Sequence, residues 1–298
     1  MSGRTIRVGT RDSALAMRQT TLVTQELQAA NPDLCFEVIA LKTLGDKVLD
    51  TRLDVIGGKG LFIKELEQAL LAGDIDLAVH SYKDMPYEDT PGLAVVALSA
   101  REAPFDVLVL PSGITELDWE KPLGTSSQRR AVQLAALYPG LAVSSVRGNV
   151  LTRIAKLDRG EFAGLVLAQA GLIRMGLEQR ISRVFSIDEM LPSGGQGILA
   201  LQGRQDEDYG YLDGLHNITS QLVSRAERSF LRCLGADCAS PVGAYASLTG
   251  QELLLKGLYV DKDGLMHKGE MRGSASLAVA VALGEALAAR ITEEVEGS

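Results

Sequence analysis

The order of hydrophobic patterns along this chain limits its fold more than any other feature. Up to about residue 217, short β-branched runs alternate with segments whose apolar residues recur at helical spacing. An alternating order of strands and helices is typical of sheets covered by helices on both faces. The 298 residues correspond to about two average domains, or to three small ones. The sequence therefore predicts an α/β fold with mainly parallel sheets.

Two groups of patterns predict two α/β lobes. The first group predicts strands near 5–10, 36–43, 75–80 and 93–99, with helices at 13–30 and 62–72. The second predicts strands at 106–110, 142–146 and 162–168, with helices at 126–137 and 149–157. Pro104 and Pro111 mark a boundary near residue 100. A strand at 198–202 would return to the first sheet, so we expect domain 1 at 1–100 plus about 197–217, domain 2 at 101–196, and a cleft.

The pattern changes after residue 218. A helix at 219–233 is followed by a loop that contains Cys238. Alternating segments and a last alanine-rich helix then follow, at 244–248, 253–260, 265–272 and 275–294. This order predicts a small α+β third domain over 218–298.

Composition excludes several classes of partner. Lys and Arg number 30 against 38 Asp and Glu, a formal charge of -8, which does not favour nucleic acid or an anionic membrane. The most apolar stretch, 275–284, is far shorter than the ~20 residues of a membrane helix. No apolar block follows the early arginines as in a secretory signal, and the three cysteines are scattered. We expect a cytoplasmic protein.

Standard metal and nucleotide sites are not indicated. His80, His216 and His267 are far apart, and no Cys/His cluster has the spacing of a zinc site. The Gly-Gly-Lys-Gly run at 57–60 lacks the Walker spacing and the following Ser or Thr. The sequence predicts no metal site.

Arginines stand at the starts of two predicted helices. The segment 125–130 follows a predicted strand, and Arg147, Gly148 and Asn149, with Arg153 one turn later, repeat the arrangement. Backbone N–H groups, hydroxyls and guanidiniums at neighbouring strand ends can converge on an anion. An arginine at a helix start is often only a solvated surface charge. Two such sets in an acidic chain favour a carboxylate-rich small molecule.

Two further segments carry reactive side chains. Lys83 and Asp84 follow a buried-looking strand and precede Pro86. They form either a loop salt bridge or a site whose carboxylate orients a substrate N–H and stabilises developing positive charge. Cys238 lies in a loop, where an exposed thiolate is a nucleophile, although an incidental thiol gives the same pattern. Cys233 is predicted to be a small buried residue of the helix.

Motifs in one fixed order extend over nearly the whole chain. They are Arg11-x-Ser13-x-Leu15-Ala16-x-x-Gln19, Gly58-Lys59-Gly60-Leu61-Phe62-x-Lys64-Glu65, His80-Ser81-x-Lys83-Asp84-x-Pro86, Gly124-Thr125-Ser126-Ser127-x-Arg129-Arg130, Arg147-Gly148-Asn149-Val150-x-Thr152-Arg153, Gly195-Gln196-Gly197, and the Cys238 loop with Pro241 and Gly243. In the identity and order of these motifs, the chain resembles the porphobilinogen deaminase (hydroxymethylbilane synthase) family. Each motif alone is weak, but the ordered set is specific.

The resemblance implies a transferase of tetrapyrrole (haem) biosynthesis. Family members join four porphobilinogen molecules head to tail, with release of ammonia, into linear hydroxymethylbilane. The product grows on a dipyrromethane cofactor held by a thioether to a loop cysteine. The family fold has two lobes like those of periplasmic binding proteins and a small third domain. We therefore expect porphobilinogen as the small-molecule partner and a monomeric enzyme.

The resemblance also assigns roles residue by residue. Cys238 matches the cofactor attachment site, and Asp84 matches the catalytic aspartate that helps to expel the amine. The other expected cofactor contacts are Lys83, Ser81, Thr125, Ser127, Arg129, Arg130, Arg147, Gly148 and Asn149. The expected substrate contacts are Arg11, Ser13, Gln19, Lys59, Arg153, Arg174 and Gln196.

The chain departs from the family pattern beside Cys238, and two alternative functions remain open. Ala236 and Asp237 stand where many family members have Gly-Gly, which adds bulk and a negative charge beside an anionic cofactor. A non-catalytic two-lobed binding module for a carboxylate-rich metabolite would have the same arginines, but it would not need Asp84 or Cys238. A phosphoribosyl or nucleotide enzyme using 57–60 lacks a proper phosphate loop and a metal-binding carboxylate pair.

Overall fold

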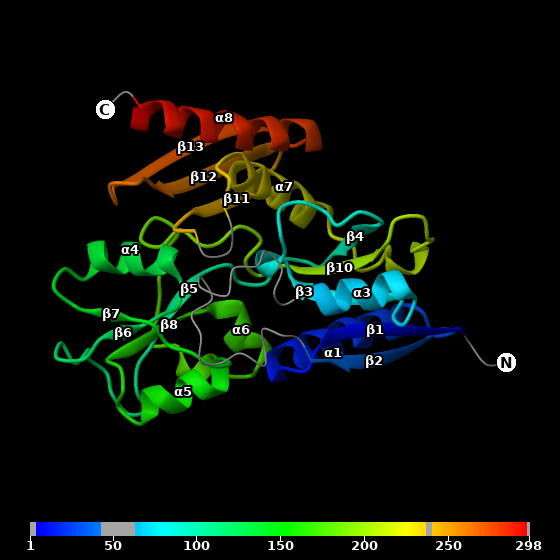
Figure 1. The fold of residues 1–298 in the computed structure, drawn as a ribbon, viewed down its shortest axis with the longest axis horizontal. Helices are drawn as coiled ribbons and strands as arrows, with labels where there is room; N and C mark the ends of the chain where they lie inside the picture. The colour runs from blue at the N-terminus through cyan, green and yellow to red at the C-terminus, as the bar shows by residue number, and fades with distance from the viewer. Residues whose placement is uncertain (1–3, 43–62, 237–239, 297–298) are drawn as a thin grey trace. The chain divides into compact units, whose positions relative to one another are not determined.

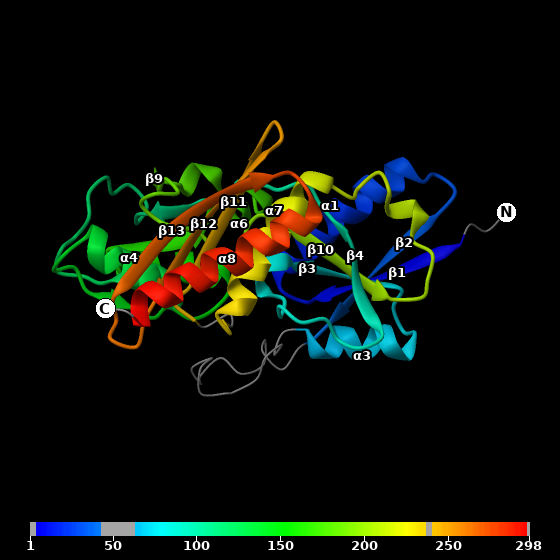
Figure 2. The same ribbon diagram turned by 90° about the horizontal axis from the view of Figure 1, so that it is seen from above.

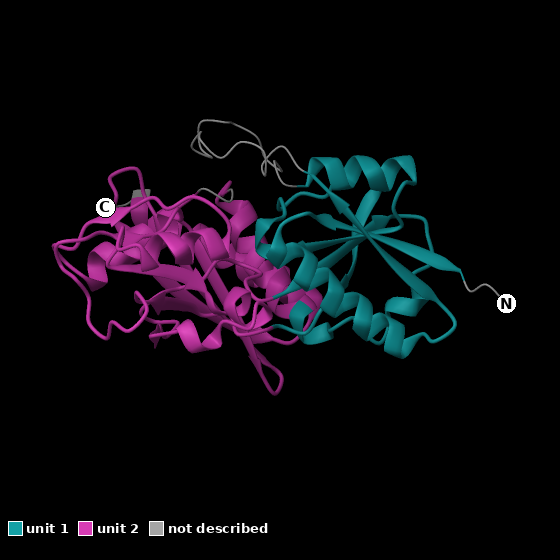
Figure 3. Ribbon diagram, turned by 90° about the horizontal axis from the view of Figure 1, so that it is seen from below, with its two compact units in different colours: residues 1–101, 198–220 teal, residues 102–197, 221–298 magenta. Residues whose placement is uncertain are grey.

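The chain divides into two compact units, each described by itself (Figure 3). The computed structural model describes residues 4–42, 63–236 and 240–296. Unit 1 comprises residues 1–101 and 198–220, and unit 2 comprises residues 102–197 and 221–298. Helices and strands alternate in both, so the predicted α/β class is confirmed.

Unit 1 is built on a five-stranded sheet in the order β2-β1-β3-β10-β4. Its strands are β1 (Thr5–Arg11), β2 (Cys35–Leu41), β3 (Leu77–Ser81), β4 (Leu93–Leu98) and β10 (Leu199–Arg204). The predicted return of a strand near 198–202 to this sheet is confirmed. The prediction of mainly parallel strands agrees with this sheet, because four of its five strands run in one direction and only β10 is reversed, antiparallel to both β3 and β4. This strand re-enters unit 1 after the excursion through unit 2, so no strand-helix-strand crossover forces it to be parallel.

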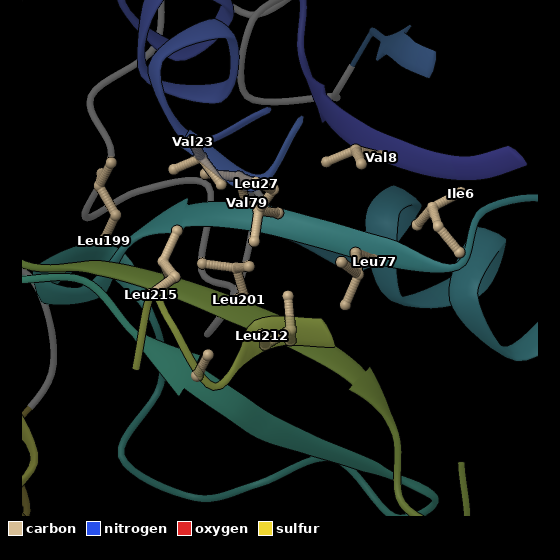
Figure 4. Packing of buried hydrophobic residues seen from close by; sticks show 11 residues of the cluster. Ile6, Val8, Val23, Leu27, Leu77, Val79, Leu199, Leu201, Leu212 and Leu215 are labelled. Carbon is tan, nitrogen blue, oxygen red and sulfur yellow. The ribbon is translucent and has the colours of Figure 1, made fainter. Parts of the chain in front are cut away.

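Two helices cover opposite faces of this sheet, α1 (Ala14–Ala30) and α3 (Lys64–Ala72) (Figure 2). On the α1 face, Val23 and Leu27 pack against Leu77, Val79 and Leu201 (Figure 4). On the α3 face, the buried cluster consists of Leu66, Ala69, Leu70, Ile75, Ala78 and Leu93. Successive side chains of a strand point to opposite faces, so β3 contributes to both clusters.

The first sheet of unit 2 has the order β7-β6-β8-β5-β9. Its strands are β5 (Asp106–Val109), β6 (Leu123–Gly124), β7 (Val143–Ser144), β8 (Gly164–Ala168) and β9 (Arg183–Val184). Its helices are α4 (Gln128–Leu137), α5 (Val150–Asp158) and α6 (Gln169–Arg174). This sheet is also mixed, because β5 is antiparallel to β8 and β9. The sequence reading missed β9 and α6, which are too short for a clear periodicity.

The second sheet of unit 2 is an antiparallel meander of β11 (Gly243–Thr249), β12 (Glu252–Val260) and β13 (Met266–Ser274). The helix α8 (Leu277–Glu296) lies along this sheet (Figure 1). The helix α7 (Ile218–Cys233) packs on the same face, because a Cβ atom at Gly257 of β12 would meet both Phe230 of α7 and Leu287 of α8. A Cβ atom at Gly257 would lie 2.5 Å from the ring of Phe230, so β12 and α7 approach each other closely there. The division of unit 2 into a second and a third domain stays a prediction.

Short 3₁₀ turns connect several of these elements. The turns are η1 (Tyr82–Asp84), η2 (Glu178–Arg180) and η3 (Gly210–Leu212). The prediction that Cys233 is buried is wrong: its position at the end of α7 leaves it exposed. No helix within the described parts of the chain has the length and apolar character needed to cross a membrane.

Candidate functional site in each unit

In unit 1, the candidate residues gather at one edge of the sheet. The strands β1 and β3 are parallel neighbours, so their carboxyl ends meet at this edge. Arg11 is the last residue of β1, and Ser13 caps α1 by accepting a hydrogen bond from the Ala16 N–H at 3.3 Å. Lys83 and Asp84 follow the end of β3. The topology thus places two cations and a carboxylate at neighbouring strand ends.

The turn that carries Asp84 is held from both sides. The Tyr82 N–H donates to the Ile198 carbonyl at 3.0 Å, and the Met85 N–H closes the turn onto the Tyr82 carbonyl at 3.2 Å. Met85 is only 3% exposed, whereas Asp84 is exposed. An anchored turn therefore presents this carboxylate to solvent.

Two other candidates of unit 1 contact each other. The Ser81 hydroxyl donates to Oε1 of Gln19 at 3.2 Å, which links the end of β3 to α1. Gln19 is buried, with 5% exposure. This contact fixes the Ser81 hydroxyl at the edge where Asp84 emerges.

In unit 2, two helix N-termini lie at adjacent strand ends. The strands β6, β7 and β8 are parallel, and the Thr125 N–H donates to the Ser144 carbonyl at 3.0 Å. Ser127 caps α4, and the side chain of Asn149 caps α5 by accepting the Thr152 N–H at 2.9 Å. Helix N-termini carry partial positive charge and free N–H groups. This edge therefore suits anionic groups.

The turn before α5 requires glycine. Gly148 has a φ of 107°, and a Cβ atom there would lie 2.7 Å from Cγ2 of Thr152. The Gly148 carbonyl accepts a hydrogen bond from Nε of Arg153 at 2.7 Å. Arg153 is thereby tied to the turn, and both it and Arg147 are half-buried.

Arg129 and Arg130 point into the interior rather than toward the helix start. Their exposures are 3% and 7%, and both bind the carboxylate of Asp106, which is 0% exposed. Arg129 donates to one oxygen at 2.8 Å, and Arg130 donates to the other at 2.7 and 3.1 Å. The expectation that these guanidiniums are free to face an anion at the start of α4 is corrected here. Both already hold a protein carboxylate, because a buried arginine needs a counter-charge.

Asp106 is ionised in this setting. Burial alone would raise its pKa, but the charges and hydrogen bonds of Arg129 and Arg130 outweigh burial and hold the pKa well below its usual range. The side-chain amide of Gln196 donates to the same carboxylate at 2.9 Å. Asp106 thus joins Arg129, Arg130 and Gln196 in one buried polar cluster.

Arg174 and Gln196 belong to the same part of unit 2. A guanidinium nitrogen of Arg174 donates to the Gly197 carbonyl, and the amide of Gln196 also donates to the Pro104 carbonyl at 2.7 Å. Burial lowers the pKa of Arg174 to about 10, while the charge of Glu102 opposes this shift. Arg174 therefore keeps its charge at neutral pH.

The strand that follows the cofactor-loop motif packs against this cluster. A Cβ atom at Gly243 would lie 3.2 Å from Cδ of Arg129, and the Ala244 N–H donates to the Pro192 carbonyl at 3.0 Å. The buried Glu227 of α7 accepts the N–H groups of Gly195 and Ala246, each at 2.7 Å. These contacts fix the elements on both sides of the loop. Cys238 and Lys59 lie outside the described residues.

The sequence reading missed the buried acids. Asp106 opens β5, whose other residues are all buried and apolar, and Glu227 lies on α7. A carboxylate at the start of an otherwise apolar strand needs a buried partner, so the position of Asp106 in the sequence already indicates a buried ion pair. The identity of the partner depends on strand order, which no local pattern gives.

The pH dependence of stability provides a first test of this site. Burial lowers the pKa of His80 to about 4, with the Gln202 hydrogen bond opposing the shift and the charge of Arg11 adding to it. Between pH 6.5 and about 4 the unfolded chain takes up a proton at this residue that the folded chain does not. Stability therefore falls with decreasing pH across this window, by about 3 kcal/mol in total from His80.

Urea unfolding between pH 7 and pH 4 measures this slope. We expect His80→Gln to flatten it. If stability falls equally steeply with decreasing pH in wild type and in His80→Gln, His80 is not the source of this pH dependence.

Comparison with known proteins identifies the family. Residues 6–210 match the family model described as porphobilinogen deaminase, dipyromethane cofactor binding domain, and residues 221–293 match the porphobilinogen deaminase C-terminal domain. A porphobilinogen deaminase of Acetivibrio thermocellus is 51% identical over 88% of this chain and 90% of its own length. One from Alkaliphilus oremlandii is 47% identical over 98% of this chain and 99% of its own.

Solved structures give a distant likeness. The methionine-binding protein MetQ aligns with 71% of this chain and 88% of its own at 14% identity and a TM-score of 0.45, which is too low to carry an argument. The two family models together cover most of the sequence. On that evidence, the chain belongs to the porphobilinogen deaminase family.

Proposed function

We propose that this enzyme uses Asp84 as its catalytic carboxylate and Cys238 as the attachment point of its cofactor. As a porphobilinogen deaminase it is a transferase that makes hydroxymethylbilane on a dipyrromethane cofactor. The observation that carries the Asp84 assignment is an exposed carboxylate on an anchored turn, at the strand edge where Arg11 and Lys83 also lie.

The residues of unit 2 fit a dipyrromethane. Each of its pyrrole units carries two carboxylates, so a receptor needs cations and N–H donors at fixed positions. The α4 and α5 N-termini, Arg147 and Arg153 supply them. When bound, the cofactor supplies the pyrrole carbon to which substrate is joined. Our proposal assigns Thr125, Ser127, Arg147, Gly148 and Asn149 to holding it, whereas Arg129 and Arg130 stay on the buried carboxylate of Asp106 behind them.

The role of Asp84 follows from charge. When the C–N bond of porphobilinogen breaks, the bonding electron pair leaves with the nitrogen as ammonia, and positive charge remains on the pyrrole. A carboxylate held beside this charge stabilises it in the transition state more than in the bound substrate. The anchored turn means that little reorganisation is needed at that moment. In the proposal, Asp84 also accepts a hydrogen bond from the departing ammonium group.

The remaining candidates bind the carboxylates of the substrate and the growing product, the arginines and the lysine by charge and the neutral side chains by hydrogen bonds. Every added pyrrole brings two more carboxylates, whose mutual repulsion must be offset. The proposed contacts are Arg11, Ser13, Gln19, Lys59, Arg153, Arg174 and Gln196. Arg174 supports this role because it keeps its charge although largely buried.

Denaturing intact-mass spectrometry tests the proposal. We expect the purified protein to carry a covalent addition equal to two linked pyrrole units, and Cys238→Ser to lack it. Cys233→Ser is the matched control, because this exposed cysteine should leave the addition in place. A wild-type mass without any addition, even after incubation with porphobilinogen, would favour the alternative of a non-catalytic module that binds a carboxylate-rich metabolite.

Location and assembly are part of the proposal. We place the enzyme in the cytoplasm, because the scattered cysteines suit a reducing compartment and Cys35 and Cys233 are free thiols. We also propose that it acts as a monomer. Light scattering coupled to size exclusion should then give a mass near 31.8 kDa.

A further inference from the structure

A chain of buried polar side chains joins the end of β3 to α3. Nε2 of His80 lies 3.1 Å from Oε1 of Gln202, and Nε2 of Gln202 donates to Oε1 of Glu67 at 2.9 Å. The Thr90 hydroxyl donates to the same Glu67 oxygen at 2.8 Å. His80, Gln202 and Glu67 are 6%, 3% and 8% exposed. None of these side chains has a part in the function proposed above.

The chain of hydrogen bonds has one direction. The amide nitrogen of Gln202 faces Glu67, to which it donates. The amide oxygen then faces His80, and Nε2 of His80 must be the donor. His80 is thereby held as the neutral tautomer that carries its proton on Nε2. Its low pKa agrees, because a buried imidazole in this setting stays uncharged at neutral pH.

These residues connect directly to the turn of Asp84. His80 precedes Ser81, with which β3 ends, and η1 follows at once. His80 pairs with Ala200 of β10, so its side chain and that of Gln202 lie on the same face, the one covered by α3. Backbone bonds hold β3 to β10, and the His80–Gln202–Glu67 chain then ties both strands to α3. The strand end that carries Asp84 is thus fixed in position and rotation.

We propose that His80, Gln202 and Glu67 are positioning residues for the reaction, which hold the β3 end so that the Asp84 carboxylate stays where charge develops. This inference rests on the proposed function, because it takes the catalytic role of Asp84 from there. Catalysis by a fixed charge is sensitive to displacements of about 1 Å. A loosened strand end therefore slows turnover without abolishing binding.

Gln202→Leu tests the proposal. Leucine has a similar size and removes both hydrogen bonds, so His80 and Glu67 lose their link. We expect kcat per cofactor-loaded molecule to fall ~10-fold or more, with KM changed less than ~2-fold. Asp76→Asn is the matched control at the other end of β3, where Asp76 binds Arg7 and Arg204. It should lower the melting temperature and leave kcat at the wild-type value.

An exchange variant tests for rescue. In Glu67→Gln/Gln202→Glu, a carboxylate at position 202 accepts from His80 and from the amide at position 67, so the link from His80 to α3 can form again, while the Thr90 hydroxyl changes from donor to acceptor of the amide at position 67. We expect most of the lost kcat to return. If these residues only stabilise the fold, Gln202→Leu lowers the melting temperature without lowering kcat, and the exchange variant restores the melting temperature alone.

Histidine ¹⁵N NMR gives a readout that does not depend on activity. The chain has three histidines, and His80→Gln identifies the His80 signals. We expect the neutral Nε2–H tautomer at pH 7, and loss of this single tautomer in Gln202→Leu. An imidazole that titrates near its ordinary pKa, or one protonated on Nδ1, would overturn the proposed chain.

The possible outcomes separate the two proposals. A cofactor-loaded wild type without turnover would remove the role of Asp84 and the positioning role with it. An active wild type, with Gln202→Leu equally active or Asp76→Asn equally slow, would refute the positioning role and leave the proposed function standing.

Discussion

Asp84→Ala lowers kcat by about 10²- to 10³-fold, the range seen when one fixed group that stabilises transition-state charge is removed. Without this carboxylate, nothing at the turn offsets the positive charge left when ammonia departs. KM should change little, because Arg11 remains to bind the carboxylates of the substrate. The fold should be retained, because Asp84 is exposed and the buried Met85 still anchors the turn.

The measurement is ammonia release per cofactor-loaded molecule, with loading determined by mass spectrometry. Asp89→Ala is the matched control: it removes an exposed carboxylate close by in the sequence and should leave kcat unchanged. Wild-type rates in Asp84→Ala would end the catalytic assignment. Equal losses in both variants would point to a general effect of surface charge.

Asp106→Asn should cause the second large effect, a loss of folding stability. The substitution leaves the buried guanidiniums of Arg129 and Arg130 without the carboxylate that they share. Breaking a buried ion pair by removing one partner costs about 3–5 kcal/mol. For a chain of this size that cost corresponds to a melting temperature lower by roughly 10 °C. Cofactor loading should fall as well, because the cluster contacts the strand that follows the cofactor loop.

Asp158→Asn provides the comparison for this variant. Asp158 binds Arg180 near the surface, with side-chain exposures of 34% and 20%, and a pair of this kind contributes at most about 1 kcal/mol. Urea unfolding of both variants at pH 7 measures the difference. If Asp106→Asn loses no more stability than Asp158→Asn, the buried ion pairs of Asp106 do not stabilise the fold as predicted.

Elements with a clear hydrophobic periodicity could be predicted from the sequence. The helix predicted at 13–30 is found as α1, and the strand predicted at 198–202 joins the first sheet as β10. Periodicity predicted them because local spacing alone decides which face of a helix or strand is apolar. Strand direction is not a local property, and for that reason the antiparallel course of β5 and β10 was not foreseen.

The residues of the candidate site could be predicted from the sequence, but most of their contacts could not. Motif order alone identified the family and marked Asp84, Cys238 and the arginines. The sequence did not reveal that Arg129 and Arg130 turn inward onto Asp106, because those residues are 23 and 24 positions apart and meet only through strand order. Nor did it reveal that Ser13, Ser127 and Asn149 also serve as helix caps.

By itself, then, the sequence determined the chemistry this protein contains: the family, the alternation of helices and strands, and the reactive residue types at strand ends. The tertiary structure alone decided which polar groups are buried together, as in the chain from His80 through Gln202 to Glu67. The physical reason is that burial makes a polar group depend on a partner, and packing selects that partner from distant parts of the chain.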